Sequence, residues 1–480
     1  MLRSSSGREK GNDRRAGRVP KARLEFDPED GDGRSAFESG SGKLHDRFQV
    51  ERAAFTALVL ASATPAMAAG LSTQEQKLVT VAGREEARSL TLLETLVNIN
   101  SGTLNTPGVE EVGRLMQAEL RELGFEVRWV PMTDVGRAGH IVATHMGSGK
   151  GRKMLLIGHL DTVFEPSSPF QKYVRRGDIA EGPGVNDMKG GLVIMVAALR
   201  AMKAAGTLKD ADITIVLTGD EERAGRPLSV SRAELIKAAK ASDLALEFEG
   251  LAQENGKDMA SIARRSATDW TLKVTAKSGH SSGIFNESVG YGAAYELARI
   301  VDGFRREARE VNATFNVGYM ASGVSASANA TDTGAVASGK TNIIPAEAIA
   351  RGDLRTLSNA QTESIRAKMR AVVAQPLAGA EASIAFEDGY PAMAPSEASR
   401  KLLVTLNEVN RDLGLEAMPE LDPLKRGAGD IGFVGDIVPG LIGFGAAGQG
   451  AHAPGETMEL KSLDRQTKRA ALFMSRMAKP

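Results

Sequence analysis

A histidine and a carboxylate stand together at the end of an apolar run that predicts a β-strand. His159 and Asp161 follow Leu155–Gly158 and lie two positions apart, so their side chains point to the same side of the strand. A metal-bound imidazole needs a partner that fixes its tautomer, and Asp161 is placed to be that partner. Taken alone, the pair is equally consistent with an ordinary polar pair at the surface.

Two further stretches add carboxylates. Asp187 lies in the glycine-rich and proline-containing segment Gly182–Gly191 just before a predicted helix, where it could bind a cation or simply cap the helix. The triplet Asp220-Glu221-Glu222 ends another predicted strand. It is either a solvated turn or a place where cations offset the repulsion and one acid remains free as a base.

A fourth stretch places Glu247 and Glu249 at the end of the apolar run that starts at Leu244. An acid inside an apolar strand is costly unless it is paired or bound to a metal, and we prefer Glu249 as the ligand because it is nearer the strand end. A fifth stretch carries His452 in a glycine-rich loop, where a histidine alone would mean little.

The composition decides which metal donors are available. The chain has no cysteine and only six histidines, so thiolate sites and disulfides are excluded and any metal must be held by His, Asp and Glu. Two histidines with at least three carboxylates suit zinc. A bridging carboxylate with two more ligands per ion would hold two metals about 3.5–4 Å apart, as in aminopeptidases.

Charge and length limit the classes of partner and architecture. The 480 residues contain 60 Lys+Arg and 60 Asp+Glu, so no net field would hold nucleic acid or an anionic membrane. Hydrophobic residues make up 42% and charged residues 25%, which is typical of a soluble globular protein with more than one core.

The first 68 residues differ from the rest. Residues 1–46 are basic, then acidic and Gly/Ser-rich, and we predict a disordered leader rather than a basic arm for nucleic acid. Residues 47–68 combine a basic flank, a short apolar run and Ala66-Met-Ala68, which predicts a signal peptide cleaved near Ala68 and a secreted or periplasmic mature chain; the alternative is a buried helix. No segment of the mature chain approaches transmembrane length.

The remaining chain predicts an α/β fold with a mainly parallel sheet. Helices are expected at 73–97 and 108–123, and strands then alternate with helices. Ligands of such sheets collect at the carboxyl ends of the strands. Residues 266–385 instead predict β-α-β-β-α-β, a two-layer α+β unit inserted between two parts of a catalytic domain, 69–265 and 386–480.

Together the motifs resemble a known family. His159-Leu-Asp161, Asp187-Met-Lys-Gly-Gly, Asp220-Glu221-Glu222, Phe248-Glu249 and Gly450-Ala-His452, in this order, are similar to the co-catalytic zinc family of glutamate carboxypeptidase, aminoacylase, carnosinase and succinyl-diaminopimelate desuccinylase. The resemblance is closest to glutamate carboxypeptidase and covers nearly the whole mature chain. It implies the zinc-exopeptidase fold with a lid and dimerisation domain.

The resemblance also implies a role for each motif residue. Asp187 would bridge two Zn²⁺ ions (Co²⁺ being an alternative), with His159 and Glu249 completing one site and Glu222 and His452 the other. Glu221 would be the general base. The peptide bond after Asp187 would be cis.

The inserted segment resembles the family's lid. His280 of Ser278-Gly-His280 would reach into the partner subunit's site and stabilise the oxyanion, although it could be an ordinary loop histidine. Two further residues would bind the substrate: Arg355, in the motif Asp353-Leu-Arg355, and Asn342, in the motif Asn342–Pro345. Arg355 would bind the carboxylate of the substrate through two parallel hydrogen bonds. Gly429, in the loop 427–430, would add a backbone contact. One departure is Arg223–Pro227, where many relatives have a shorter turn.

The expected function is therefore metal-dependent hydrolysis of an amide bond beside a free carboxylate, by a homodimer acting on a small peptide or an N-acyl amino acid. A deacylase of N-acyl amino acids is the alternative within hydrolases. A binding protein that kept the fold and lost catalysis would lack a ligand or the base, and none is missing from the motifs. A nucleic-acid protein has only the basic leader in its favour.

Overall fold

The computed structural model describes residues 70–480. The expected leader at 1–46 and the signal peptide at 47–68 lie outside the described residues, so both stay predictions. No helix among residues 70–480 combines the length and apolar character that crossing a lipid bilayer requires.

Three helices open the described chain: α1 (Thr73–Ala82), α2 (Glu86–Val97) and α3 (Thr106–Leu123). The single helix expected at 73–97 is in fact two, because α1 ends at Gly83. Glycine is a poor helix former, and its missing side chain lets Lys468 of the C-terminal helix lie within contact distance.

The main sheet has six strands and is mainly parallel, which confirms the predicted α/β class. Its four parallel strands are β6, β3, β7 and β19, and β2 and then β1 extend it as an antiparallel edge. In spatial order the strands are β1 (Glu126–Pro131), β2 (Gly139–His145), β6 (Ile213–Thr218), β3 (Met154–His159), β7 (Leu244–Glu247) and β19 (Gly440–Ile442).

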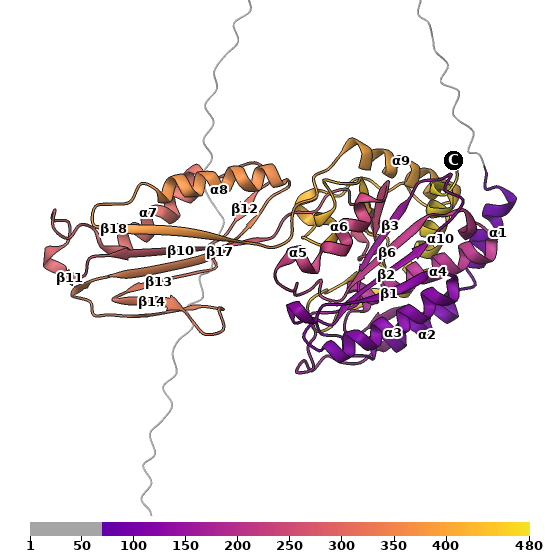
Figure 1. Ribbon diagram of the computed structural model, residues 1–480, viewed down its shortest axis with the longest axis horizontal. Helices are drawn as coiled ribbons and strands as arrows, with labels where there is room; N and C mark the ends of the chain where they lie inside the picture. The colour runs from indigo at the N-terminus through magenta and orange to yellow at the C-terminus, as the bar shows by residue number, and fades with distance from the viewer. Residues whose placement is uncertain (1–69) are drawn as a thin grey trace, which may run out of the picture. The chain divides into compact units, whose positions relative to one another are not determined.

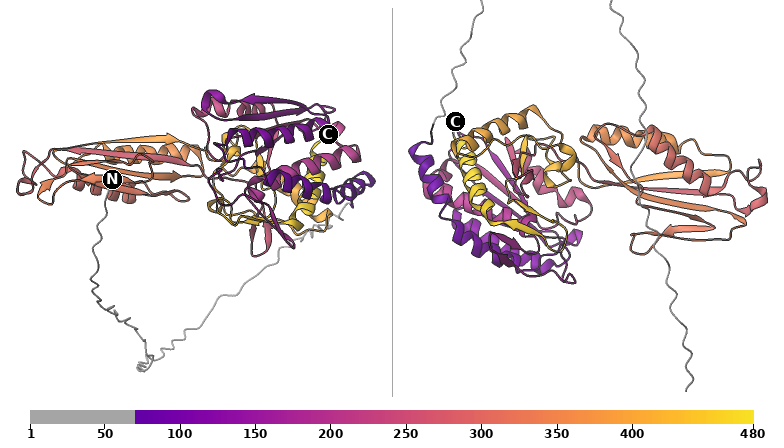
Figure 2. Two further views of the ribbon diagram at one scale, coloured as in Figure 1. Left: turned by 90° about the horizontal axis from the view of Figure 1, so that it is seen from below. Right: turned by 180° about the vertical axis from the view of Figure 1, so that it is seen from behind.

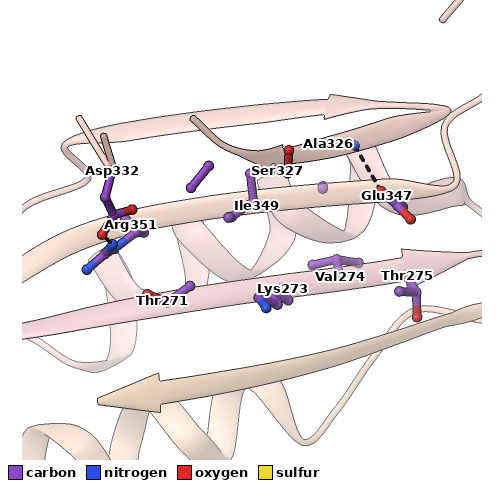
Figure 3. A pocket seen from close by; sticks show the side chains of 12 residues that line it. Thr271, Lys273, Val274, Thr275, Ala326, Ser327, Asp332, Glu347, Ile349 and Arg351 are labelled. Carbon is purple, nitrogen blue, oxygen red and sulfur yellow. Dashed lines mark hydrogen bonds and ion pairs between the residues drawn. The ribbon is translucent and has the colours of Figure 1, made fainter. Parts of the chain in front are cut away.

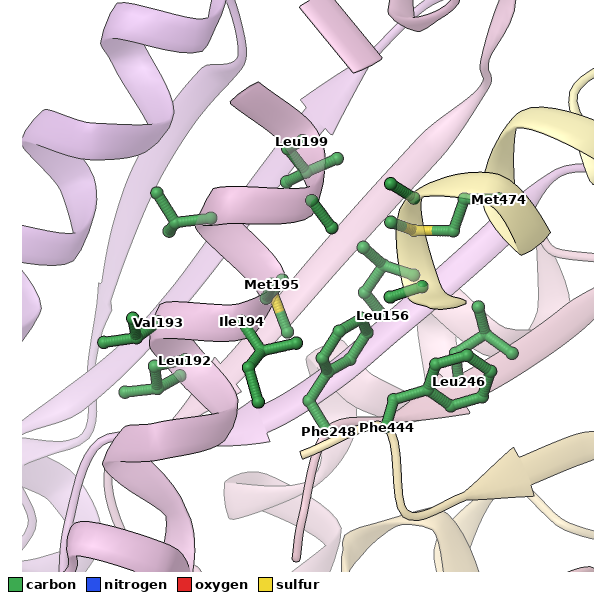
Figure 4. Packing of buried hydrophobic residues seen from close by; sticks show 14 of the residues in the cluster. Leu156, Leu192, Val193, Ile194, Met195, Leu199, Leu246, Phe248, Phe444 and Met474 are labelled. Carbon is green, nitrogen blue, oxygen red and sulfur yellow. The ribbon is translucent and has the colours of Figure 1, made fainter. Parts of the chain in front are cut away.

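Helix α4 (Gly190–Ala205) forms the centre of the core on one face of this sheet. It is apolar around nearly its whole circumference, as expected of a helix with protein on all sides. It packs against β3 and against α1, α2, α3 and α10 (Leu460–Met477), and Figure 4 shows Ile194 and Met195 of α4 on the side that faces Leu156 and Phe248. In Figures 1 and 2, α10 lies beside α1, so the two ends of the described chain meet.

A smaller core covers the opposite face of the sheet, where Leu235 and Ala239 of α6 (Ala233–Lys240) pack against Leu155 and Val216. The short helix α5 (Leu228–Ser231) contacts α6, whereas α9 (Glu397–Asp412) packs against α10 and β19 and contributes to the first core.

A four-stranded antiparallel sheet brings two distant loops together. Its strands, in spatial order, are β20 (Gly448–Gln449), β21 (Thr457–Glu459), β5 (Ile179–Glu181) and β4 (Val174–Arg176). Because β21 pairs with β5, the loop between β20 and β21 lies next to the segment that follows β5. A separate hairpin is formed by β8 (Ala252–Glu254) and β9 (Lys257–Met259).

The inserted segment contains its own antiparallel sheet and core. The strands are β10 (Thr268–Ala276), β12 (Thr314–Phe315), β13 (Tyr319–Gly323), β17 (Glu347–Arg355) and β18 (Ala380–Asp388). Helices α7 (Gly292–Glu307) and α8 (Asn359–Val373) cover one face, where Trp270 packs edge-on against Phe304. This is the expected two-layer α+β unit; the exact domain boundaries stay predictions.

Two short antiparallel strand pairs complete this unit. Strands β14 (Ser325–Ala328) and β15 (Ala335–Ser338) pair within the Ser/Ala/Gly-rich stretch, and β11 (Gly279–His280) pairs with β16 (Ile343–Ile344). A cavity of about 450 Å³ is lined by residues of β10, β14 and β17 (Glu347–Arg355). In Figure 3, Ala326 and Ser327 of β14 lie above Thr271 and Lys273 of β10, which also line this cavity.

Candidate active site

Asp187 lies between two histidines that are far apart in the sequence. Its Oδ1 is 3.1 Å from Nε2 of His159, and its Oδ2 is 3.0 Å from Nε2 of His452. His159 ends β3, whereas His452 lies in the loop between β20 and β21. One carboxylate that offers one oxygen to each side is the arrangement that a bridging ligand needs.

Asp161 is buried behind His159 and connects it to the acid triplet. Its backbone oxygen is 3.1 Å from Nδ1 of His159, and its carboxylate Oδ1 is 3.5 Å from the same nitrogen. The carboxylate also accepts hydrogen bonds from the backbone N–H groups of Glu221 and Glu222, at 3.0 and 3.1 Å, and from the Thr103 hydroxyl at 2.6 Å. Asp161 therefore occupies Nδ1 of His159, so that Nε2 is the nitrogen that faces Asp187. Its hydrogen bonds to Glu221 and Glu222 also fix the start of the loop after β6.

Two groups of donor atoms are close enough to hold a cation. Within each, one atom per residue lies within 4.8 Å of the others: Asp187 with Glu222 and His452, and His159 with Glu221 and Glu222. Oε1 of Glu222 is buried and has no hydrogen-bond partner, while Oε2 lies 3.2 Å from His452 Nε2. A buried carboxylate oxygen without a partner is costly, and a metal ion would satisfy it. The donors are all nitrogen and oxygen, so the residues present fit zinc or a similar divalent ion.

The group of Asp187, Glu222 and His452 corresponds to the second expected ligand set, whereas the other group shares only His159 with the first expected set. Glu249 is absent from both groups, and its Oε2 pairs with Arg264 at 2.7 Å. It nevertheless lines the same cavity as Asp187 and Glu221. Glu247 does not line that cavity: its Oε2 pairs with Arg264 at 2.5 Å and its Oε1 accepts from the backbone N–H of Ile431 at 2.9 Å. The geometry thus favours Glu249 over Glu247 as a ligand.

The loop that carries Asp187 is held by a buried carboxylate. Glu456 accepts hydrogen bonds from the backbone N–H groups of Gly184, Asn186 and Asp187, at 2.9, 2.7 and 2.8 Å. Gly184 has a φ of +71°, a conformation that glycine adopts without strain. The bond between Asp187 and Met188 is cis, as the resemblance implied.

The helix behind this loop approaches the sheet closely. A Cβ at Gly191, in the first turn of α4, would lie 1.8 Å from the backbone oxygen of Phe248. Only glycine allows the loop with Asp187 and the strand end before Glu249 to come this near each other.

The acid triplet is anchored by a fully buried arginine. Arg232 donates to Asp220 at 2.6 Å and to Asp430 at 2.7 Å, and the hydroxyl of Tyr390 donates to the backbone oxygen of Glu221. Asp220 is therefore occupied by a structural ion pair, which leaves Glu221, at the cavity wall, and Glu222 as the two acids of the triplet that belong to possible metal-binding groups.

The carboxylates of this region crowd one another. Burial, reinforced by Glu249 and Glu222, raises the pKa of Glu221 well above its ordinary value. Burial and then the charge of Asp187 raise the pKa of Glu222 to about 7. Hydrogen bonds with Asp187 and Glu222 raise the pKa of His452 to about 11. These pKa shifts indicate an excess of negative charge, and bound cations would offset it.

A cavity of about 460 Å³ opens over these residues and is lined by Asp187, Glu221, Glu249 and His452. Gly427 and Ala428 of the loop 427–430 also line it. His159, Asp161 and Glu222 contact these residues but do not line the cavity themselves, and the lid residues His280, Asn342 and Arg355 and the loop residue Gly429 do not line it either. Arg355 instead pairs with Asp353 at 2.9 Å, and Gly429 lies against the guanidinium of Arg264.

Residues 155–476 match the peptidase family M20/M25/M40. The chain belongs to this family. Carboxypeptidase G2 of Pseudomonas sp. (strain RS-16) is 29% identical over 363 residues, which cover 74% of this chain and 81% of that protein. A succinyl-diaminopimelate desuccinylase of Leptothrix cholodnii is 26% identical over 388 residues, covering 78% and 95%.

The solved structure of Bacillus subtilis YXEP, described as a dinuclear metal binding peptidase of the M20 family, has the same fold. Its TM-score is 0.56 at 14% identity, and the match covers 82% of this chain and 98% of that chain. This M20 chain is accordingly an enzyme of the metal-dependent peptidase and amidohydrolase type.

Sequence reasoning missed several residues of this M20 site: Glu456, Thr103, Arg232 and Arg426. Glu456 follows His452 in the same glycine-rich stretch, but nothing in its local sequence shows that it is buried against the Asp187 loop. Thr103 lies 58 positions from Asp161, and Arg232, between α5 and α6, joins Asp220, 12 positions away, to Asp430, 198 positions away. Only the folded chain reveals these contacts.

Proposed function

We propose that this M20 enzyme hydrolyses an amide bond next to a free carboxylate, as a carboxypeptidase of the glutamate-carboxypeptidase type that uses two Zn²⁺ ions. The observation that carries the proposal is the position of Asp187 between the imidazoles of His159 and His452, with Glu222 beside it. A carboxylate that serves two sides is the central element of a two-metal hydrolytic site.

The proposed ligands form two sets around Asp187. His159 and Glu249 would hold one ion, and Glu222 and His452 the other; cobalt could replace zinc. When bound, such ions supply a water of near-neutral pKa and polarise the amide carbonyl. For Glu249 to be a ligand, one of its oxygens must face the ion while the other keeps its pairing with Arg264.

The chain's own residues would carry the proton. Glu221 lines the cavity and makes no side-chain ion pair among the described residues, which suits a base that takes a proton from water and later delivers it to the leaving amine. Asp161 would keep His159 in one tautomer and orientation.

The lid would complete the site in a homodimer. His280 lies just beyond the end of β10. This nine-residue strand begins where the lid begins and is ~30 Å long. Such a position suits a histidine that reaches the site of a second copy, where it would stabilise the developing oxyanion. Arg355, Asn342 and the backbone at Gly429 would bind the substrate, with Arg355 on the carboxylate.

Two alternatives differ in what they predict. The resemblance to a desuccinylase favours, as the second candidate, a deacylase of N-acyl amino acids. A binding protein on the same fold would bind such molecules without turning them over.

We also propose that the mature chain is secreted or periplasmic, on the basis of residues 47–68.

The test is a metal count on the purified mature chain with a panel of peptides and N-acyl amino acids, before and after chelation. We expect two zinc ions per chain and turnover that chelation abolishes and zinc restores. Preference for peptides over N-acyl amino acids would separate the first candidate from the second. A fully metal-loaded chain that cleaves no member of the panel would contradict both and favour the binding protein.

A further inference from the structure

The active-site cavity has buried cations in its lining. Arg264 and Arg426 line it together with Asp187 and His452, and the two arginine side chains are only 5% and 14% exposed. Buried guanidinium groups normally have partners for their charge and for their N–H donors, so the partners of each arginine indicate its role.

Arg264 is fully occupied by the protein. It pairs with Glu247 at 2.5 Å and with Glu249 at 2.7 Å, and its Nε donates to the backbone oxygen of Gly427 at 2.8 Å. With two carboxylates and a carbonyl around it, Arg264 has little left to offer a ligand. It holds the loop 427–430 against the strand end that carries Glu249.

Arg426 is not occupied in this way. Its nearest carboxylate oxygen is Oε2 of Glu249 at 3.5 Å, which is already bound to Arg264. Its Nε is buried and has no hydrogen-bond partner. Leaving a buried charged donor unpaired is costly, so its presence beside an active-site cavity indicates that a ligand satisfies it.

The chemistry of that ligand follows from the guanidinium. Its planar fork binds a carboxylate through two parallel hydrogen bonds, which adds geometric selectivity to charge. The adjacent Lys425 is more exposed and pairs with Glu254 at 2.5 Å, so among the two neighbouring cations Arg426 is the one left for an anion.

We propose that Arg426 is a specificity-determining residue that binds a second carboxylate of the substrate, beyond the one next to the scissile amide. This inference rests on the proposed hydrolysis, and it makes the preferred substrates dicarboxylates. The second carboxylate could belong to the side chain of an acidic residue or to the far end of a dicarboxylic acyl group.

The experiment compares matched substrates in wild type, Arg426→Gln and Arg426→Lys, with Lys425→Gln as the control that removes a neighbouring positive charge. N-acetylglutamate and N-acetylglutamine differ only in the side-chain carboxylate, and N-succinylalanine and N-butyrylalanine only in the acyl carboxylate. We expect Arg426→Gln to lower kcat/KM at least about tenfold for the dianion of one pair and to leave its neutral partner unchanged. The pair that responds shows where the carboxylate belongs.

Arg426→Lys should lose most of this preference, because a lysine cannot form the two parallel hydrogen bonds. Lys425→Gln should behave as wild type. An equal loss on both members of each pair, or no loss on either, would overturn the proposal, and a metal count on each variant separates this outcome from loss of the ions.

A binding measurement keeps this inference distinct from the proposed reaction. Glutarate and butyrate are titrated calorimetrically into the metal-loaded wild type and the Arg426→Lys variant. We expect wild type to bind glutarate at least about tenfold more tightly than butyrate and the variant to lose that difference. Such a result without any turnover would defeat the hydrolase proposal only. Turnover with equal glutarate and butyrate affinities in wild type would defeat the role of Arg426 only.

Discussion

The carboxylate of Glu456 accepts a hydrogen bond from the backbone N–H of Asp187, at 2.8 Å and across 269 positions of the sequence. The same carboxylate accepts from Gly184 and Asn186, so one fully buried side chain fixes the whole turn before the proposed bridging ligand. Glu456 also lies in the stretch that carries His452. The loops of the two ligands are thereby joined to each other directly.

We expect Glu456→Gln to weaken metal binding by about 10- to 100-fold, the usual effect of losing a group that orients a ligand. The amide would turn an N–H₂ group towards backbone donors and leave at least one of them unsatisfied, which costs about 1–3 kcal/mol of unfolding free energy. Competition with a chelator gives the affinity and thermal unfolding gives the stability. Wild-type values in both would show that these hydrogen bonds do not position Asp187.

Asp161→Asn should retain the fold and lose metal affinity by about 10- to 100-fold. The neutral amide cannot hold the imidazole of His159 as a carboxylate does, although it still accepts from Thr103. Metal content after dialysis against graded zinc concentrations is the measurement. Thr103→Val is the matched control, because it removes one contact of Asp161 and leaves its charge; it should have the smaller effect.

Glu221→Ala should keep its metals and lose at least about 10²-fold in turnover, the scale of a positioned proton-transfer group. The variant's Asp161 still accepts from the backbone N–H at position 221, so the loop should remain in place. Steady-state rates beside a metal count are required. Turnover close to that of wild type would remove Glu221 from the role of base.

His280→Ala should lower turnover without loss of metal, since the lid histidine is expected to act in a second copy of the chain. Mixing this variant with Glu221→Ala under conditions that exchange subunits should then restore part of the activity, because one mixed site contains both intact residues. Loss of metal in His280→Ala would instead make it a ligand. No recovery on mixing, with proven exchange, would place its action within one chain.

Glu75 should make stability depend on pH in the acid range. Burial opposes its charged form, but the backbone N–H of Ser72 and the guanidinium of Arg476 outweigh this and lower its pKa to about 2. A carboxyl whose pKa is lowered by folding stabilises the protein above its unfolded pKa, and this contribution is lost as pH falls from about 4.5 towards about 2.

Denaturant unfolding of metal-free wild type and Glu75→Gln at about pH 6 and about pH 3 tests this. We expect wild type to be the more stable at the higher pH, with the difference shrinking at the lower pH. The use of metal-free protein keeps release of the ions at low pH from contributing. A difference that stays constant between the two conditions would contradict the assignment.

The sequence by itself predicted the candidate ligands of the site and determined the class of the fold. His159 and His452 stand out because histidine is scarce, and Asp187 and Glu222 because they lie in a glycine-rich loop and at the end of an apolar run, and these signals are local. The alternation of strands and helices is equally local, so the parallel sheet and the separate α+β unit could be predicted from periodicity.

Only the tertiary structure decided which groups hold these residues and which acids face the cavity. Glu247 and Glu249 are two positions apart, so alternation places both on one side and cannot separate them. Arg264 pairs with both, and what separates them is the backbone N–H of Ile431, which occupies the second oxygen of Glu247, whereas Glu249 lies at the cavity wall. The unsatisfied Nε of Arg426 is likewise invisible in the sequence. Burial and pairing depend on segments far apart in the chain, and these meet only when it folds.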